Sequence, residues 1–179
     1  MKALKIIGII LLVLLAIVLI PPAFVNGNYA VEREVTINQP VDVAFDYFKL
    51  LKSQEDYSVW SKMDPAMEKS YSGTDGTVGA VYYWAGNKEV GKGEQEIIAV
   101  KDGERIDYVL RFMEPFESTD FAYITTESKN DSVCLVKWGF TGKMTYPMKG
   151  MLLFMDMEDM LGQQLGDGLE NAKKVLESI

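Results

Sequence analysis

The chain has 179 residues, of which 18 are Lys or Arg and 26 are Asp or Glu, so its net charge is −8 at neutral pH. This acidic balance argues against nucleic acid as a partner, because phosphate backbones attract basic surfaces. The sequence contains no His, which excludes Ser-His and Cys-His nucleophiles, His general bases and His-ligated metals. We therefore predict no metal site and no cofactor.

The chain begins with an apolar segment just long enough to cross a bilayer. Residues 6–25 contain no charged side chain, and residues 6–20 are nearly all aliphatic. A bilayer core of about 30 Å needs about 20 apolar helical residues. Lys2 and Lys5 precede the segment, and no Lys or Arg follows it until Arg33. This asymmetry predicts a cytoplasmic N-terminus, with the rest of the chain outside.

Residues 1–26 are accordingly predicted to be a single-pass anchor in the cell (inner) membrane, and residues 27–179 an extracytoplasmic domain. Without Lys2 and Lys5 the chain keeps 16 basic and 26 acidic residues, so this domain carries −10. A cleaved signal peptide is the alternative, although residues 21–27 contain no good Ala-x-Ala site. A buried core helix is a weaker alternative, since the segment has no amphipathic pattern.

Alternation of apolar and polar residues predicts a strand over residues 29–37. Pro40 then opens a first helix, and a second short helix is predicted over residues 52–60. Beyond Pro65 the chain shows short apolar runs separated by Gly, Asp and Asn turns, which is typical of an antiparallel meander. The six strands predicted there cover residues 67–71, 78–84, 91–100, 105–113, 119–127 and 133–141.

The last segment has helical periodicity, which predicts a long helix over residues 148–179. The predicted order is one strand, two short helices, six strands and one long helix. This order indicates an α+β fold in which a curved, seven-stranded antiparallel sheet surrounds the C-terminal helix. The residues of the predicted stripe on that helix are Met151, Phe154, Glu158, Leu161, Leu165, Leu169, Ala172, Leu176 and Ile179, the last of which lies outside the residues that the structure below describes.

Short motifs are spread along nearly all of residues 30–178. They are Trp60-Ser61-Lys62-Met63-Asp64-Pro65, Tyr71-Ser72-Gly73, Gly76-Thr77-Val78-Gly79-Ala80, Trp84-Ala85-Gly86-Asn87, Val90-Gly91-Lys92-Gly93, Phe112-Met113-Glu114-Pro115-Phe116, Val136-Lys137-Trp138, Phe154-Met155-Asp156-Met157 and Gly168-Leu169-Glu170-Asn171-Ala172-Lys173. These motifs resemble the SRPBCC superfamily (START and Bet v1-like proteins of helix-grip fold), and more narrowly its bacterial polyketide cyclase/dehydrase-like branch. The resemblance implies a deep apolar cavity for a lipid, sterol, polyketide or other hydrophobic ligand. Only some members are enzymes, and the N-terminal anchor lies outside the pattern.

Aromatic side chains are the main candidates for a cavity wall, because ligand pockets are mostly apolar with few polar groups. The alternative is that these side chains simply fill the core. Trp and Tyr are the better candidates, since each carries a donor that needs a partner. The candidate cavity residues are Phe45, Phe48, Trp60, Tyr82, Trp84, Tyr108, Phe112, Trp138, Phe140, Met151, Phe154, Met155 and Glu158.

Two residues are candidates for acid–base chemistry, Glu158 and Tyr82. If Glu158 faces the sheet, burial raises the pKa of its carboxyl group and makes it a general acid. A small rotation of the helix would instead place Glu158 in solvent. Cys134, the only cysteine, lies in an apolar run and is predicted to be a small buried hydrophobe.

Six methionines occur between residues 144 and 160. Met adapts to irregular surfaces, so they are candidates for a deformable ligand lining, whereas helical spacing also fits a packed core. A copper site with thioether ligands is a poorer explanation of the same residues.

Three functions remain open from the sequence. The first is a membrane-anchored extracytoplasmic domain that binds a small hydrophobic ligand. The second is a cyclase- or dehydratase-like enzyme with carboxylate or Tyr acid–base chemistry. The third is a module for protein interaction that the anchor holds near a partner.

Overall fold

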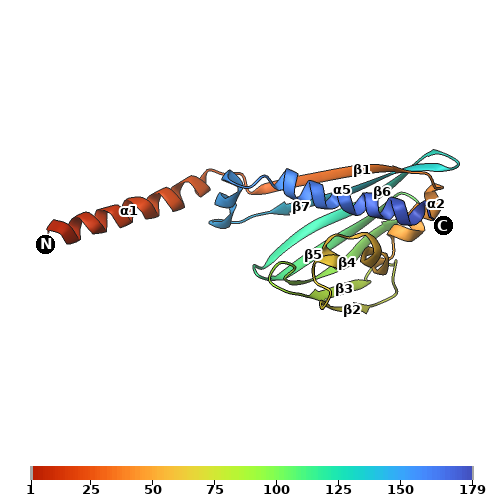
Figure 1. Ribbon diagram of the computed structural model, residues 1–179, viewed down its shortest axis with the longest axis horizontal. Helices are drawn as coiled ribbons and strands as arrows, with labels where there is room; N and C mark the ends of the chain where they lie inside the picture. Colours follow the sequence, from red (N-terminus) through yellow and green to blue (C-terminus); the bar gives the residue numbers. More distant parts are fainter. Residues whose placement is uncertain (1, 179) are drawn as a thin grey trace.

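A computed structural model describes residues 2–178 of the chain. A long N-terminal helix, α1 (Lys2–Ala23), projects from a domain in which a seven-stranded sheet curves around a C-terminal helix, α5 (Met157–Leu176) (Figure 1). The predicted α+β architecture is confirmed. The elements between α1 and α5 are β1 (Asn28–Ile37), α2 (Val41–Phe48), η1 (Leu51–Ser53), α3 (Gln54–Tyr57), α4 (Trp60–Met63), β2 (Glu68–Ser72), β3 (Val81–Ala85), β4 (Lys92–Lys101), β5 (Arg105–Glu114), β6 (Ser118–Asn130), β7 (Val133–Lys143) and η2 (Met148–Leu153).

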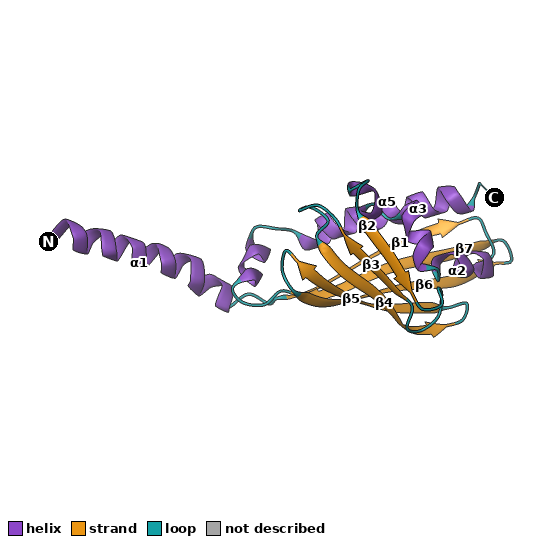
Figure 2. Cartoon of the chain, turned by 90° about the horizontal axis from the view of Figure 1, so that it is seen from below, coloured by secondary structure: helices purple, strands orange, loops and turns teal. Residues whose placement is uncertain are grey.

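The sheet has the strand order β1-β7-β6-β5-β4-β3-β2, and every neighbouring pair is antiparallel. Strands β2 to β7 form the predicted meander, and β1 returns to pair with β7. The β4–β5 ladder shifts register between Lys92 and Gly93 and again between Ile97 and Ala99. Such irregularities bend a strand and increase its twist, so they contribute to the curvature seen in Figure 2.

The core lies between the concave face of the sheet and the helices. Helix α5 buries Leu165, Leu169, Ala172 and Leu176 at the predicted spacing. Cys134 on β7 is fully buried, as predicted, and its burial raises the pKa of the thiol. The apolar stripe of α5 thus packs the helix against β1 and β7, the strands that α5 contacts most.

Two helix boundaries differ from the prediction. Residues 148–153 form the separate 3₁₀ helix η2, and α5 begins only at Met157. Asp156 caps α5 by accepting a hydrogen bond from the backbone N–H of Asp159 at 3.1 Å, a strong start signal that ends the longer helix. The helix predicted over residues 52–60 is also divided, because Ser58 has extended backbone angles (φ −65°, ψ 130°) between α3 and α4.

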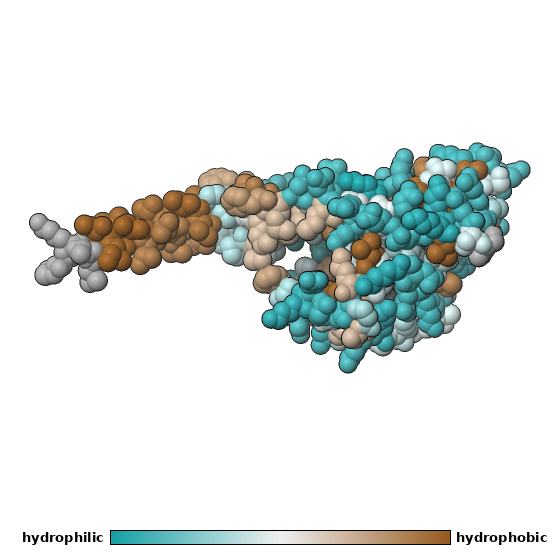
Figure 3. All heavy atoms as spheres, viewed as in Figure 1, coloured by the Kyte–Doolittle hydropathy of each residue, from teal (hydrophilic) through white to brown (hydrophobic). Residues whose placement is uncertain are grey.

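Helix α1 is the one helix within residues 2–178 that is long and apolar enough to cross a membrane, and its apolar stretch is almost wholly exposed (Figure 3). Its last turn contacts η2. The Nζ of Lys149 donates a hydrogen bond to the carbonyl of Ala23 at 3.3 Å, and the Cα of Gly150 faces the ring of Pro22 so closely that an added Cβ would lie 2.5 Å from its Cγ. Length and composition fit both an anchor and a signal sequence.

Two glycines of α5 provide a matched test of helix packing. A Cβ added at Gly168 would lie 2.8 Å from Cζ3 of buried Trp138, whereas one added at Gly166 meets nothing closer than Cγ of Arg33 at 3.9 Å. We expect Gly166→Ala to stabilise the domain by about 0.5–1 kcal/mol through helix propensity. Gly168→Ala should destabilise it by about 1–3 kcal/mol through overpacking.

The measurement is urea unfolding of the full chain in detergent micelles, followed by tryptophan fluorescence. Equal stabilisation by both substitutions would contradict the close packing of α5 against Trp138.

Candidate ligand-binding site

Aromatic side chains from three strands form a strip on the concave face of the sheet. Tyr71 of β2 lies opposite Tyr82 of β3 in register, and their rings stack with centroids 5.0 Å apart. The strip continues from Tyr82 to Trp84 at 5.8 Å, and from Trp84 to Phe112 of β5 at 5.7 Å in an edge-to-face arrangement. Alternate residues of a strand share a face, so these four rings form one wall.

The ring of Trp84 lies over Gly93, its cross-strand partner on β4. A Cβ added at Gly93 would be 2.7 Å from Cζ2 of Trp84. The absence of a side chain at Gly93 therefore allows the indole ring to lie flat against the sheet. This contact explains why glycine occupies position 93, inside a strand where a glycine is otherwise unfavourable.

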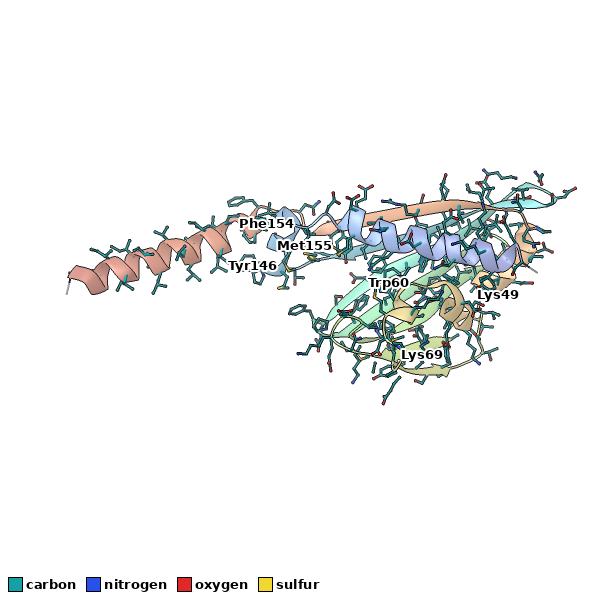
Figure 4. All side chains as sticks on the ribbon, in the orientation of Figure 1. Lys49, Trp60, Lys69, Tyr146, Phe154 and Met155 are labelled. Carbon is teal, nitrogen blue, oxygen red and sulfur yellow. The ribbon has the colours of Figure 1, made fainter. Side chains whose placement is uncertain are left out.

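A second aromatic wall comes from the helices and β7. Trp138 of β7 contacts Tyr57 of α3 at 5.5 Å and Trp60 of α4 at 5.9 Å, both edge-to-face. Tyr57 also contacts Phe48 of α2 at 5.3 Å. In Figure 4, Trp60 lies in the region between α5 and the lower half of the sheet. The chain has three tryptophans, and all of them belong to these two walls.

Helix α4 bridges the two walls. Trp60 packs on Trp138, and the next residue, Ser61, lies close enough to Tyr82 of the opposite wall to influence the pKa of its hydroxyl. No residue of α4 is fully buried, and Trp60 is only half-buried, as is Phe112 at the end of the strip. Since the surrounding rings are buried, Trp60 and Phe112 mark where the aromatic interior reaches the surface.

Two tyrosine hydroxyls near the second wall lack hydrogen-bond partners. Tyr57 is fully buried, and neither its hydroxyl nor that of Tyr47 is paired with any residue that the structure describes. Burial raises the pKa of Tyr57 well above its ordinary value, so the hydroxyl stays neutral. Tyr108 differs, because its hydroxyl donates to the carbonyl of Phe48 at 3.3 Å. An unpaired buried hydroxyl is available to a polar atom of a ligand.

A polar cluster joins α3 to the edge strand β2. The hydroxyl of Tyr71 donates to Glu55 at 2.6 Å, and the Nζ of Lys69 donates to the other oxygen of the same carboxylate at 3.0 Å. These two hydrogen bonds lower the pKa of Glu55. The cluster holds α3 against β2, at the edge of the sheet that lies farthest from β1 in the strand order.

A second polar group lies on the concave face near the end of the sheet that adjoins α1. Asp120 of β6 is buried and accepts from the hydroxyl of Ser118 at 3.0 Å and from the backbone N–H of Lys143 at 3.3 Å. Burial raises the pKa of its carboxyl group. Tyr29, which stacks on Phe140 at 6.2 Å, has a pKa raised to about 12 by burial and by the charge of Asp120.

Most predicted cavity residues lie together on the concave side. They include seven buried residues, namely Phe45, Phe48, Tyr82, Trp84, Tyr108, Trp138 and Phe140, with half-buried Trp60 and Phe112 packed against them. Met155 is half-buried between η2 and α5. Whether these residues contact a ligand stays a prediction.

Three predicted cavity residues lie elsewhere. Phe154 is 91% exposed, Met151 is also exposed, and the side chain of Glu158 is 74% exposed with an oxygen 3.9 Å from Nη1 of Arg33. Phe154 and Met151 lie outside the cavity because α5 begins only after Asp156, so the predicted helical stripe does not extend to them. Glu158 lies in the first turn of α5, but its side chain points into solvent beside Arg33. The solvated carboxylate of Glu158 is not the desolvated acid that the sequence suggested.

Several residues of the site were missed from the sequence. Tyr57 and the buried polar residues Gln95 and Asp120 face the interior. Asp120 is in phase with Ala122 and Ile124, which would have predicted an inward side chain, but apolar Phe121 obscures the alternation. Phe121 itself is exposed on the convex face.

Two surface hollows of about 460 Å³ each adjoin the domain near its α1 end. One lies between β1 and the start of α5 and is lined by Arg33, Asp156, Asp159, Met160 and Gln163. The other lies over β1, β7 and β6, where Tyr29, Phe121 and Lys143 contribute to its walls. Neither contains the aromatic walls, whose rings touch one another.

We expect substitution of the two buried tyrosines to have opposite effects. Tyr108→Phe removes the donor to the Phe48 carbonyl and should cost about 1–2 kcal/mol. Tyr57→Phe removes a hydroxyl without a partner, so it should be neutral or stabilise the ligand-free protein by up to about 1 kcal/mol. Urea unfolding of the full chain in detergent measures both, and a comparable loss of stability in Tyr57→Phe would show that its hydroxyl is paired.

Comparison with solved structures gives clear likenesses of fold at low sequence identity. Norcoclaurine synthase from Thalictrum flavum, in complex with dopamine and hydroxybenzaldehyde, has a TM-score of 0.63 and 10% identity over 86% of this chain and 88% of its own. The Mll3558 protein from Rhizobium loti has a TM-score of 0.61 and 15% identity over 82% and 96%. Ara h 8.0201 has a TM-score of 0.57 and 15% identity over 86% and 100%.

The fold is the Bet v1-like helix-grip fold. The resemblance predicted from the motifs is confirmed at this level, whereas the polyketide cyclase/dehydrase-like branch stays a prediction. No protein-family model and no curated protein sequence matches the chain.

Proposed function

We propose that this protein is a membrane-anchored, extracytoplasmic domain that binds a small hydrophobic or lipid-like ligand between the sheet and its helices. Residues 1–26 would form the anchor and residues 27–179 the binding domain. The observation that carries the proposal is the pair of aromatic walls, which meet at α4 and reach the surface at Trp60 and Phe112. The complex of norcoclaurine synthase with dopamine and hydroxybenzaldehyde gives a precedent for aromatic ligands in this fold.

The ligand enters by displacing Trp60. Within each wall the rings are in contact, with centroids 5–6 Å apart, so a ligand needs space that the side chains must yield. Helix α4 is the element best suited to move, because it is four residues long and buries no residue fully. Loosely packed elements open at lower free energy than the core strands.

The polar atoms of the site orient the ligand. An apolar chain between the walls would be held by burial, which is non-directional. The hydroxyls of Tyr57 and Tyr47 lack partners within residues 2–178, so a carboxyl or hydroxyl oxygen of the ligand would gain hydrogen bonds that the free protein leaves unmade. This arrangement favours an amphiphile with one polar end.

The acid–base residues predicted for an enzyme do not suit that role. The carboxylate of Glu158 is in solvent. Burial raises the pKa of Tyr82 to about 12, so its hydroxyl stays protonated at neutral pH and donates hydrogen bonds rather than removing protons. Binding is therefore the function that the geometry supports best.

We expect a brominated fatty acid to quench the tryptophan fluorescence of the full chain in detergent micelles. Because all three tryptophans lie in the walls, quenching should be saturable and reversed by the unbrominated acid. Leu110→Lys places a charge on the concave face of β5 and should weaken binding by about tenfold or more. Met113→Lys, on the convex face of the same strand, is the matched control and should bind like the wild type.

The absence of saturable quenching in the wild-type chain would contradict the proposed site. Equal losses of ligand affinity in Leu110→Lys and Met113→Lys would mean that the ligand does not bind on the concave face.

We expect the domain to be accessible from outside the cytoplasm. Asp131→Cys introduces a thiol in the exposed turn between β6 and β7, while buried Cys134 leaves the wild-type chain as a background control. A membrane-impermeant maleimide should label Asp131→Cys in intact spheroplasts, and the mass of the extracted chain should include residues 1–26. Labelling only after lysis would contradict the topology, and a shortened mass would replace the anchor with a cleaved signal.

A further inference from the structure

A group of large apolar side chains is exposed where the domain adjoins α1. Phe154 and Phe24 are 91% and 86% exposed, and Tyr146, Met151 and Leu153 are also exposed. We call these five residues the apolar collar. Figure 4 shows Tyr146 and Phe154 at the end of the domain nearest α1, and Figure 3 shows hydrophobic residues continuing from α1 onto this region. Contiguous exposed apolar surface of this kind marks an interaction site.

The position of the collar is fixed by contacts with the end of α1. The backbone N–H of Met144 donates to the carbonyl of Gly27 at 2.9 Å, and Lys149 donates to the carbonyl of Ala23. Only residues 24–27 separate α1 from β1, and four extended residues reach about 14 Å at most. When α1 spans a bilayer, the collar must therefore lie at or near its surface.

The composition of the collar suits the region between lipid chains and headgroups. Three of its five members are Phe or Tyr, and aromatic side chains favour this depth. Lys143 precedes Tyr146 of the collar by three residues, and a long basic side chain can extend from an apolar surface toward phosphates. The strongly acidic surface elsewhere disfavours other faces of the domain as contacts with anionic lipid.

The same end of the domain leads toward the aromatic site. Met155, which follows the collar directly, is half-buried beneath the beginning of α5, on the side toward Trp60 (Figure 4). Leu161, one turn into α5, packs half-buried against the core. Opposite them, the turn between β5 and β6 carries exposed Phe116, and this turn also lies on the α1 side of the domain (Figures 1 and 2).

We infer that the apolar collar docks into the bilayer surface and presents the aromatic site to the membrane, so that an acyl-chain lipid passes between bilayer and site without crossing water. The inference rests on the proposed function and names its ligand class and source. Burying several apolar side chains in the bilayer is favourable by the hydrophobic effect. Directional entry through the collar end also explains why these apolar side chains are exposed together.

The depth of the collar can be measured without any ligand. The full chain is placed in phosphatidylcholine nanodiscs, with an environment-sensitive dye attached at Phe154→Cys or, as control, at Phe121→Cys on the convex face. Buried Cys134 serves as the unlabelled background. We expect blue-shifted emission and quenching by headgroup spin-labelled lipid at position 154, with neither effect at position 121.

Two results at position 154 would overturn the docking. Emission as water-exposed as that at position 121 would mean that the collar is outside the bilayer. A blue shift without quenching by spin-labelled lipid would mean that a protein, such as a second copy of the chain, covers the collar.

Lipid loading tests the second half of the inference. In nanodiscs that contain brominated phospholipid, the intact mass of the ejected chain reports bound lipid over time. We expect the double substitution of Leu153→Ser and Phe154→Ser to load about tenfold more slowly than wild type, and Phe121→Ser to load at the wild-type rate. Thermal unfolding verifies that each variant is folded.

Equal loading rates in all three chains would overturn uptake through the collar while leaving the proposed function intact. Absence of lipid from the wild-type chain would overturn both uptake and the proposed lipid ligand, whereas the dye measurement would still decide the docking by itself.

Discussion

Aromatic rings packed over glycines are the contact on which the architecture of this domain depends. Where a large ring has to lie flat against a curved sheet or between sheet and helix, the facing residue must lack a side chain. Trp84 uses Gly93 and Trp138 uses Gly168. The same arrangement recurs at the cross-strand pairs Tyr29–Gly142 and Tyr123–Gly139. Each glycine lets its neighbour cover backbone that would otherwise be exposed, which offsets the low strand and helix propensity of glycine.

This pairing also relates the fold to the candidate site. Trp138, seated against Gly168, is the ring that Tyr57 and Trp60 contact. Trp84, seated against Gly93, joins Tyr82 to Phe112. The glycines therefore position one indole ring in each wall. The ligand site is a consequence of the same packing that holds α5 in place.

The strands were predictable because apolar alternation and short turns act locally. All seven lie within a few residues of their predicted bounds, and α2 begins directly after Pro40 as expected. The errors occurred where a local signal competed with a periodic one. The apolar stripe ran back through Phe154 and Met151, but the capping carboxylate of Asp156 ended the helix and released the preceding residues toward α1. The inward side chain of Asp120 was hidden by exposed Phe121 beside it, and the unpaired hydroxyl of Tyr57 depends on neighbours from distant parts of the chain.

The pairing of β1 with β7 sets the order in which the domain can be completed. Asn28 at the start of β1 pairs with Lys143 at the end of β7, so the strand of this domain that is made first pairs with the strand that is made last. Strands β3 to β7 each pair with a strand already made, whereas β1 stays without its partner until β7 has been made. Contacts that join such distant parts of a chain form slowly and leave strand edges open to wrong partners. Because only residues 24–27 separate β1 from α1, the proposed anchor would keep β1 beside the bilayer until β7 is made and pairs with it.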